Sequence, residues 1–159
     1  MRSMDMDQTN TWSNVAPVKA KKALDHVPQR PGLYKLTFKV FDNVYIYIGE
    51  ANDLQRRIRE YASNPTEGNY KEYLLFDLLN EVGEAELSIC CDDGLQTAEA
   101  RRKREKIAID DTVRQGLRCL NRGQTNDIAM QRFQLKSKEK VLQNELERIR
   151  AKLAALPQP

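Results

Sequence analysis

Residues 31–61, with the sequence PGLYKLTFKVFDNVYIYIGEANDLQRRIREY, carry the strongest structural signal in the chain. The runs GLYKLTFKV and VYIYIG are rich in β-branched and aromatic residues, and the segment FDN with its Asp-Asn pair separates them. Two such runs around a turn-forming pair are typical of an antiparallel hairpin. We therefore predict a β-hairpin over residues 32–49.

The hydrophobic period changes directly after this hairpin, from two to about 3.6 residues. Leu54, Ile58 and Tyr61 recur at i, i+4 and i+7, which places them on one side of a helix. The Asn-Asp pair at 52–53 supplies an N-cap. We predict a first helix that ends near Tyr61.

The rest of the chain predicts further helices and one more strand. The segment AELSICCDD, residues 85–93, resembles a strand with Leu87, Ile89 and Cys91 on one face. A short helix is expected to start at Ser13 or Asn14. Two longer helices are expected at residues 70–82 and from Thr97 to about Gly116.

This order of elements predicts an α+β fold, a small domain whose three-stranded antiparallel or mixed sheet is flanked by helices. We place the domain at residues 29–123. Residues 1–28 are expected to be disordered apart from the short helix, and residues 124–159 to form a C-terminal helix.

The C-terminal helix, expected at residues 125–155, has a heptad-like apolar seam. The seam consists of Leu135, Leu142, Leu146, Ile149, Leu153 and Leu156, which follow one another at spacings of 7, 4, 3, 4 and 3. A coiled coil that forms a homodimer through residues 135–156 is one interpretation. The other is a helix that packs its stripe back on its own domain.

Composition limits the protein class. The chain has 159 residues, enough for one core, and its opening stretch has no apolar segment of the kind that begins a secretory signal. No apolar run approaches the ~20 residues that cross a bilayer, so we expect a cytoplasmic protein without a membrane partner. Three cysteines make no zinc pattern and are expected to be reduced thiols. The single histidine, His26, has no neighbour suited to catalysis or metal binding.

The net charge is only +3, but the charges are strongly segregated. Residues 67–93 hold eight acids and one base, whereas residues 101–122 hold eight bases and three acids. The basic segment is either a solvated helix face with local salt bridges or a stripe that contacts phosphates. In the second case Arg101, Arg102 and Arg104 would bind nucleic acid.

Five short motifs in a fixed order resemble the GIY-YIG nuclease superfamily. They are Pro31-Gly32-Leu33-Tyr34, Tyr47-Ile48-Gly49, the segment Asp53-Leu54-x-x-Arg57-Ile58-x-x-Tyr61, Glu105, and Leu120-Asn121. The resemblance covers residues 31 to 122. It implies a metal-dependent nuclease in which the position of Tyr34 is the general base, assisted by that of Tyr47.

In such a nuclease Arg57 would stabilise the charge of the transition state at the phosphate, and the helix geometry agrees with this role. At ~100° per residue, Arg57 borders the apolar stripe while Arg56 faces water. An arginine beside a core is costly unless it meets an anion, and a phosphate suits its fork of donors. The alternative is an arginine whose stem lies on the core and whose head pairs with an acid.

The same reasoning applies to the helix expected from Thr97 to about Gly116. It places Ala98, Arg102, Ile109 and Val113 on the buried side, with Glu105 close to them. A carboxylate among cations is either simple neutralisation or a ligand for Mg²⁺ (or Mn²⁺), which prefers hard oxygen donors. We prefer Glu105 to Glu99 as that ligand.

Two smaller motif positions have open interpretations. Gly49 marks either a close approach of the backbone to the substrate or a sharp turn into the helix. Asn121 is either a loop asparagine or a residue that holds the cleft or a phosphate oxygen through hydrogen bonds.

The chain departs from the family after YIG, where the frequent lysine is replaced by Glu50. A carboxylate repels a phosphate, so either a base in the Arg101 to Lys106 run supplies the lost charge or activity is reduced. We expect a Mg²⁺-dependent endonuclease acting on DNA, with RNA left open. The alternatives are a DNA-binding module with little catalysis and an interaction protein that oligomerises through its C-terminal helix.

Overall fold

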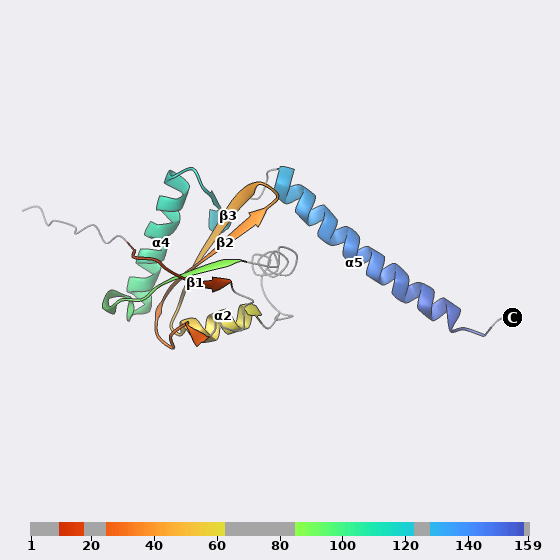
Figure 1. Ribbon diagram of the computed structural model, residues 1–159, viewed down its shortest axis with the longest axis horizontal. Coiled ribbons are helices and arrows are strands. Elements are labelled where there is room, and N and C mark those ends of the chain that lie inside the picture. The colour runs from red at the N-terminus through yellow and green to blue at the C-terminus, as the bar shows by residue number, and fades with distance from the viewer. Residues whose placement is uncertain (1–9, 18–24, 63–84, 123–127, 158–159) are drawn as a thin grey trace, which may run out of the picture. The chain divides into compact units, whose positions relative to one another are not determined.

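The structure is a computed structural model that describes residues 10–17, 25–62, 85–122 and 128–157 (Figure 1). The chain divides into two compact units, residues 1–124 and 125–159. The first unit contains β1 (Ser13–Pro17), β2 (Gly32–Val40), β3 (Asn43–Ala51), α2 (Leu54–Ala62), β4 (Glu86–Cys90), η1 (Asp93–Leu95), α4 (Ala98–Arg114), β5 (Arg118–Cys119) and η2 (Leu120–Arg122), and the second contains α5 (Ile128–Ala154).

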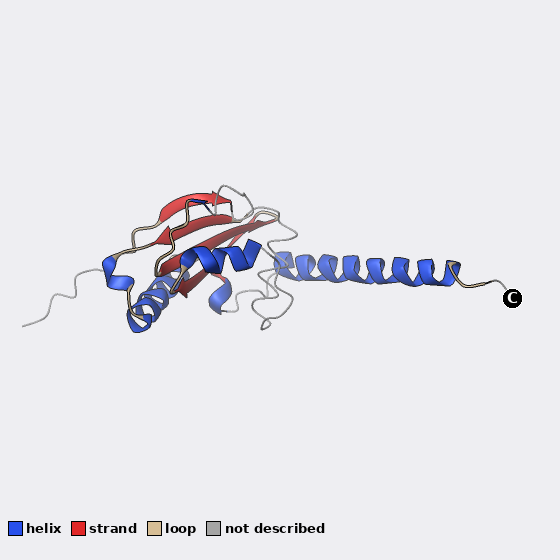
Figure 2. Cartoon of the chain, turned by 90° about the horizontal axis from the view of Figure 1, so that it is seen from below, coloured by secondary structure: helices blue, strands red, loops and turns tan. Residues whose placement is uncertain are grey.

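The first unit is built on one mixed sheet with the strand order β1-β4-β2-β3-β5. Figure 2 shows these strands side by side with helices next to them. The pairs β1·β4, β2·β4 and β2·β3 are antiparallel, and β3·β5 is parallel. The prediction of an α+β fold is confirmed. The sheet has five strands rather than the predicted three, because two short edge strands were not expected.

The edge strand β1 corrects the prediction of a helix that starts at Ser13 or Asn14. Ser13 pairs with Ile89 of β4, and the Asn14 Oδ1 accepts a hydrogen bond from Ser88 Oγ at 2.7 Å. Pro17 ends this strand, a position at the sheet edge where its missing N–H does not break a ladder. The rest of that predicted helix, at 18–24, and the predicted helix at 70–82 lie outside the described residues.

The predicted hairpin forms as β2 and β3, with a tighter turn than the sequence suggested. Val40 pairs with Asn43, so the loop consists of Phe41 and Asp42 rather than the Asp-Asn pair. Phe41 has a φ of 54°, which the two-residue loop requires. The turn fixes the register in which Tyr34 pairs with Gly49.

Residue alternation divides the sheet into two covered faces. On one face Tyr34, Leu36 and Phe38 of β2 lie with Tyr45 and Tyr47 of β3, and α2 adds the buried residues Leu54, Ile58 and Tyr61. On the other face Ile46 and Ile48 pack against Ala108 of α4, with Trp12 beside them. The sheet therefore separates α2 from α4.

The helices α2 and α4 begin and end close to the predicted residues. Asp53 Oδ1 accepts a hydrogen bond from the backbone N–H of Arg56 at 3.0 Å, so Asp53 is the cap of α2. Thr97 caps α4 by accepting from the N–H of Ala100 at 3.2 Å. Gly116, with a φ of 75°, follows α4 in the left-handed conformation that often terminates helices.

The buried face of α4 corrects our prediction. Ala98, Arg102 and Val113 are exposed, and the buried residues are instead Arg101, Arg104, Ala108 and Thr112. The short side chains of Ala108 and Thr112 let the helix approach the sheet closely. The two arginines are accepted inside because each meets acids and polar oxygens, which offset the cost of removing their charge from water.

The helix α5 confirms the predicted C-terminal helix. Its seam residues are exposed, from 46% for Ile149 to 68% for Leu135. In the described part of the chain, no helix has both the length and the apolar composition needed to cross a membrane. Cys90, Cys91 and Cys119 form no disulfide, as predicted.

Candidate active site

Three tyrosines and one arginine meet on the α2 face of the sheet. The hydroxyl oxygens of Tyr34 on β2 and Tyr61 on α2 are 2.9 Å apart and share a hydrogen bond. Arg57 Nε donates to the Tyr34 hydroxyl at 3.4 Å, and its guanidinium carbon lies 5.1 Å from the centre of the Tyr61 ring. The Tyr47 ring is 6.3 Å from that of Tyr34. The hairpin and the first helix thus bring together Tyr34, Tyr47 and Arg57.

Burial keeps two of these phenols neutral. It raises the pKa of Tyr47 above the usual value, and the nearby Tyr34 raises it further, while Arg57 partly opposes the shift. Burial likewise raises the pKa of Tyr61, again with Tyr34 adding to the effect. At neutral pH, Tyr47 and Tyr61 are therefore neutral and do not act as bases.

The two neighbouring arginines of α2 point in different directions, as the helix geometry predicts. The Arg57 side chain is 31% exposed, and that of Arg56 is 64% exposed. Arg57 also donates to Glu60 Oε2 at 2.9 Å, so its head is paired with an acid, as the alternative interpretation held. Arg56 lies 3.8 Å from the same carboxylate and donates to Asn52 Oδ1 at 3.1 Å. Only Arg57 reaches the tyrosines.

Gly49 is required by a side chain of the protein itself. A Cβ atom at this position would lie 2.3 Å from Cζ of the Tyr34 ring. The strand β3 continues to Ala51, so the chain makes no sharp turn at Gly49. The close approach suspected from sequence is therefore that of the Tyr34 ring.

Asn121, on η2, clamps β3 next to the tyrosines. Its Oδ1 accepts from the backbone N–H of Ile48 at 2.9 Å, and its Nδ2 donates to the carbonyl oxygen of the same residue at 2.6 Å. The amide thereby continues along β3 the pairing that β5 makes with Tyr45 and Ile46. Its hydrogen bonds hold the strand, and with it Tyr47 and Gly49.

Glu50 is paired with a base from the run 101–106. Glu50 Oε2 lies 2.7 Å from Arg101 Nε, and the Arg101 side chain is only 6% exposed. Arg101 also donates to the carbonyl oxygens of Leu95 and Gln96. The carboxylate that replaces the expected lysine is thus neutralised inside the protein.

Arg104 is also buried, contrary to its predicted role as a nucleic-acid contact. Its Nε donates to Asn10 Oδ1 at 2.8 Å, and its Nη1 donates to the carboxylate of Asp92 at 2.5 and 2.7 Å. With Arg101 and Arg104 engaged inside, Arg102 is the exposed member of the predicted binding triplet.

An open cavity of about 420 Å³ lies where the first turns of α2 and α4 approach the end of β3. Its wall carries four arginines and two acids, which are Arg56, Arg57, Arg101, Arg102, Glu50 and Glu60. A cavity rich in guanidinium groups suits a phosphate. Through Arg57 it adjoins the tyrosine cluster.

Glu105 lies one turn along α4 from Arg102 and is half-buried. Burial raises the pKa of its carboxyl, the charge of Glu50 raises it further, and Arg102 partly opposes both. Glu105 in turn raises the pKa of Tyr47. Its charge therefore acts on both the tyrosine cluster and Glu50.

The carboxylates near the cavity fit a divalent cation with hard ligands. The charge of Glu50 makes the ionisation of Glu105 more costly, a cation would relieve that cost, and Mg²⁺ needs only one or two carboxylates because it retains several waters. In the described ranges, no three His, Cys, Asp or Glu side chains are grouped for a metal. Glu105, close to this cavity, could act as such a ligand, whereas Glu50 is paired with Arg101 and Glu60 with Arg57.

Tyr61 is a site residue to which the sequence analysis gave no role beyond its place in the buried stripe and at the end of the third motif. Its spacing of four residues from Arg57 was visible, and this spacing puts both side chains on one side of the helix. The sequence gave no sign that its hydroxyl would reach Tyr34, because that contact depends on how α2 docks on the sheet.

Comparisons of the chain with protein-family models, with curated proteins and with solved structures found no match. The interpretation of the site therefore rests on its motifs and geometry.

Proposed function

We propose that the chain is a metal-dependent endonuclease of the GIY-YIG type that hydrolyses phosphodiester bonds in DNA. The observation that carries the proposal is the hydrogen bond from Arg57 Nε to the Tyr34 hydroxyl at 3.4 Å, next to a cavity walled by guanidinium groups. The two motif residues are 23 positions apart in the sequence. A pair that served only the core would not need a partly exposed cation at an open, arginine-lined cavity.

The reaction is attack of water on phosphorus, with cleavage of one phosphorus–oxygen ester bond. In this proposal a phenolate at Tyr34, with Arg57 as its counter-charge, takes the proton of the water, and Arg57 also stabilises the charge that develops on the phosphate oxygens. Tyr61, whose hydroxyl shares a hydrogen bond with that of Tyr34, and Tyr47 are neutral and hold the cluster together. Asn121 and Gly49 hold the strand and the ring in place without touching the substrate.

Glu105 would hold the Mg²⁺ ion, with waters completing its coordination. Bound there, the ion would supply positive charge for the oxygen that leaves phosphorus. The protein's own contribution is to keep this carboxylate half-buried and close to Glu50 and Arg102.

DNA contact is proposed to come from the exposed cations at the cavity, Arg102 and Arg56. Arg101 and Arg104 are left out of the proposed contact surface because both are buried and paired. Neutralising exposed cations reduces the number of released counterions, so the salt dependence of binding should weaken with each change. The same chemistry would serve RNA, which the assay includes as a second substrate.

The substitution Glu105→Gln tests the proposal, with Glu99→Gln as the matched control on the same helix. Cleavage of supercoiled plasmid, single-stranded DNA and RNA is measured with Mg²⁺ and with a chelator. We expect Glu105→Gln to abolish Mg²⁺-dependent cleavage, to bind DNA equally or more tightly, and to unfold at a similar temperature. Normal cleavage by this variant, or equal loss in the control, would contradict the assignment.

A second candidate function, a DNA-binding module with little catalysis, is favoured by the ion pairs that occupy the cavity wall. Arg57 is 2.9 Å and Arg56 3.8 Å from Glu60, and Arg101 is 2.7 Å from Glu50, so three of its four arginines already have anionic partners. In the same assay this candidate predicts salt-dependent DNA binding that weakens in Arg102→Ala and no cleavage with Mg²⁺ or Mn²⁺.

A further inference from the structure

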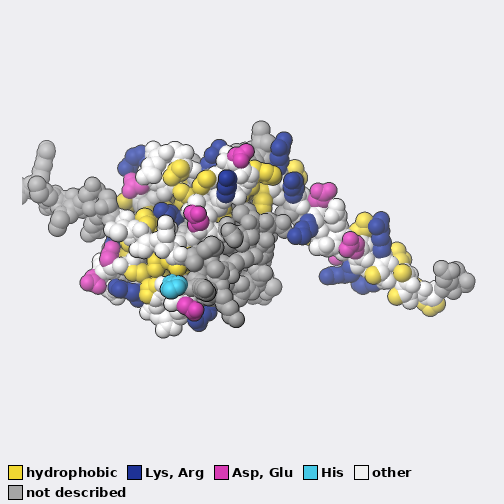
Figure 3. All heavy atoms as spheres, viewed as in Figure 1, with side chains coloured by type: hydrophobic (Ala, Val, Ile, Leu, Met, Phe, Trp, Pro, Cys, Tyr) yellow, Lys and Arg dark blue, Asp and Glu magenta, His cyan; other side chains and the backbone are white. Residues whose placement is uncertain are grey.

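The helix α5 carries an apolar stripe that the proposed nuclease site does not use. Four of its residues are Leu142, Leu146, Ile149 and Leu153, which are 60%, 47%, 46% and 63% exposed. Figure 3 shows hydrophobic side chains among charged ones along this helix. Exposure of such an apolar stripe to water is unfavourable, so we expect another apolar surface to cover it.

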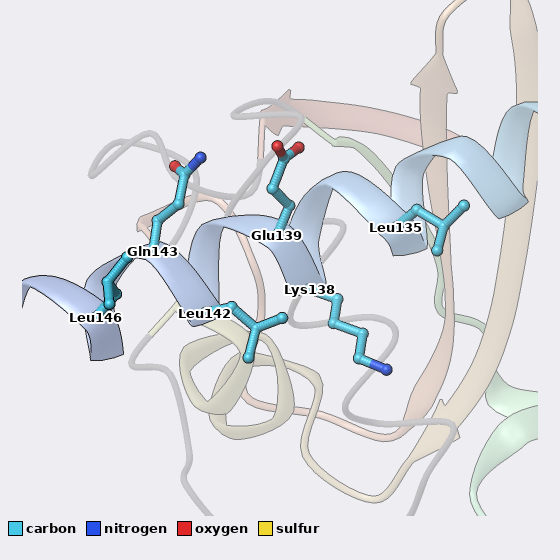
Figure 4. Close-up of a pocket in the computed structure, with 6 residues that line it drawn as sticks. All are labelled: Leu135, Lys138, Glu139, Leu142, Gln143 and Leu146. Atoms are coloured by element: carbon cyan, nitrogen blue, oxygen red, sulfur yellow. The ribbon is translucent and has the colours of Figure 1, made fainter.

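The surface of the stripe contains a shallow cavity that side chains of a second helix could fill. The cavity measures about 520 Å³, and Figure 4 shows the side chains that line it projecting from successive turns of α5. With Leu142 and Ile149 at d positions and Leu146 and Leu153 at a positions, the cavity is bordered by a, d, e and g residues. These are the positions that form a hole for a knob in a coiled coil.

We propose that α5 pairs with α5 of a second copy of this chain, and that the two helices run antiparallel. The apolar seam follows an alternating spacing of four and three residues from Leu142 to Leu156. A second copy of the helix has the same apolar row, so the two rows can pack against each other. The orientation follows from the charged residues that occupy the same seam.

A parallel, in-register pair would bring like charges together. Glu139 and Arg132 fall at a positions of the register that Leu146 and Leu153 define. In a parallel pair each would face its own copy, with two carboxylates in one layer and two guanidinium groups in another. Such layers are strongly unfavourable without counter-charges between them.

An antiparallel pair avoids both like-charge layers. When Leu146 faces Ile149 of the second copy, Leu142 faces Leu153, and Glu139 falls opposite Leu156 at the end of the overlap. Arg132 then lies beyond the overlap. Four apolar layers remain at the centre of the pair, and no charged residue is enclosed between them.

The flanking charges are complementary in this orientation. The antiparallel register places Glu145 beside Lys152 of the second copy, and the two-fold symmetry repeats the contact. Within its own helix Glu145 is 3.7 Å from Arg148. This ion pair is exposed and weak, so its replacement by the pair with Lys152 of the second copy costs little free energy. The flanking e positions, Gln143 and Arg150, meet without repulsion.

Mass measurement tests the pairing without any need for nuclease activity, so its outcome is independent of the proposed function. Light scattering on the full chain at micromolar concentration is expected to give a dimer. The double variant Leu146→Glu with Ile149→Glu is expected to be a monomer. The matched control, Val141→Glu with Ala151→Glu, alters exposed residues off the seam of the same helix and should remain a dimer. A parent chain that is monomeric up to about 100 µM would overturn the proposal.

Cysteine cross-linking tests the orientation. In the antiparallel pair, neither the Leu142→Cys nor the Leu153→Cys chain alone should form a disulfide-linked dimer, whereas an equal mixture of the two should, as a band of twice the chain mass on a non-reducing gel. The parent chain, whose Cys90 and Cys119 are buried, gives the background. Preferential self-linking of Leu142→Cys would overturn the antiparallel assignment, because only a parallel pair places that position opposite itself.

Discussion

The ring of Tyr34 lies directly against the backbone of Gly49, its partner on the neighbouring strand. A Cβ atom at position 49 would lie 2.3 Å from both Cζ and the hydroxyl oxygen of that ring. The same hydroxyl is held by Tyr61 and Arg57. The glycine therefore fixes the position of the oxygen that we propose as the proton acceptor.

Gly49→Ala should displace the Tyr34 ring and lower stability by about 2 kcal/mol, in the range of overpacked cores. Urea unfolding measures the loss. The control is a double-mutant cycle with Tyr34→Ala, in which the added methyl group has no ring to meet, so Gly49→Ala should cost much less there. An equal penalty in both backgrounds would show that the overlap with the ring is not the cause.

Arg57→Ala should lower the cleavage rate on the order of 10²-fold, as loss of a charge contact to the transition state does. Arg56→Ala should change it little, because that side chain faces solvent and contacts Asn52 rather than the tyrosines. Single-turnover cleavage at saturating enzyme separates the rate from DNA affinity. Similar rates for the two variants would contradict the geometry of α2.

Glu50→Lys introduces the residue that the family often has, yet we expect it to be harmful here. The new ammonium would face Arg101, whose side chain is 6% exposed and has lost its carboxylate. A buried pair broken in this way costs about 3 kcal/mol, less where water enters. Thermal unfolding measures the loss, and Glu86→Lys, an exposed change on β4, is the control with the same chemistry. Unchanged stability together with faster cleavage would contradict this prediction.

The hairpin and the helix caps were predictable because their signals are local. Alternation in GLYKLTFKV, a turn-forming pair, and the period that begins at Leu54 each depend on neighbours in sequence. The edge strand β1 was not predictable in this way, since its pairing with β4 joins residues 74 apart, as between Asn14 and Ser88. Its Pro17 suggested a helix start as readily as the end of a strand.

The candidate site was predicted in its residues but not in its electrostatics. On α4, apolar periodicity selected Ile109 and Val113 as the inner face, whereas the helix instead buries Arg101 and Arg104. The ion pairs of these two arginines, with Glu50 on β3 and with Asp92 just before η1, outweigh a weak apolar pattern. Those acids lie in other elements, so a charge run in one helix does not show which of its cations face inward.

Asn121→Ala should lower stability by about 2 kcal/mol, because it leaves the N–H and the carbonyl of Ile48 without their side-chain partners. Asn121→Asp should be at least as harmful, since it replaces the donor to that carbonyl with a second acceptor. Chemical unfolding measures both. Asn52→Ala, at an exposed position, is the control and should cost less than about 0.5 kcal/mol. Equal effects at the two positions would exclude the clamp.

Substitution of Lys35 is expected to increase the stability of the protein rather than to lower it. Its ammonium lies 4.7 Å from the centre of the Trp12 ring, in a cavity of about 250 Å³ on the α4 face of the sheet. Among the described residues it forms no ion pair, and burial lowers the pKa of Lys35 below 10.5. Lys35→Met keeps an apolar stem against the indole and removes the buried charge, so it should raise Tm by a few degrees.

The pH dependence of that gain follows from the sign of the shift. Because the folded-state pKa of Lys35 is lower than the unfolded one, the charged lysine opposes folding fully at any pH below the folded pKa. The penalty shrinks as pH rises through the folded pKa and is gone above about 10.5. The Tm difference between Lys35→Met and the parent should therefore be largest near neutral pH and vanish at alkaline pH. Lys39→Met, exposed on the same strand, should show neither the gain nor its pH dependence, and a gain that stays constant with pH would exclude the charge of Lys35 as its cause.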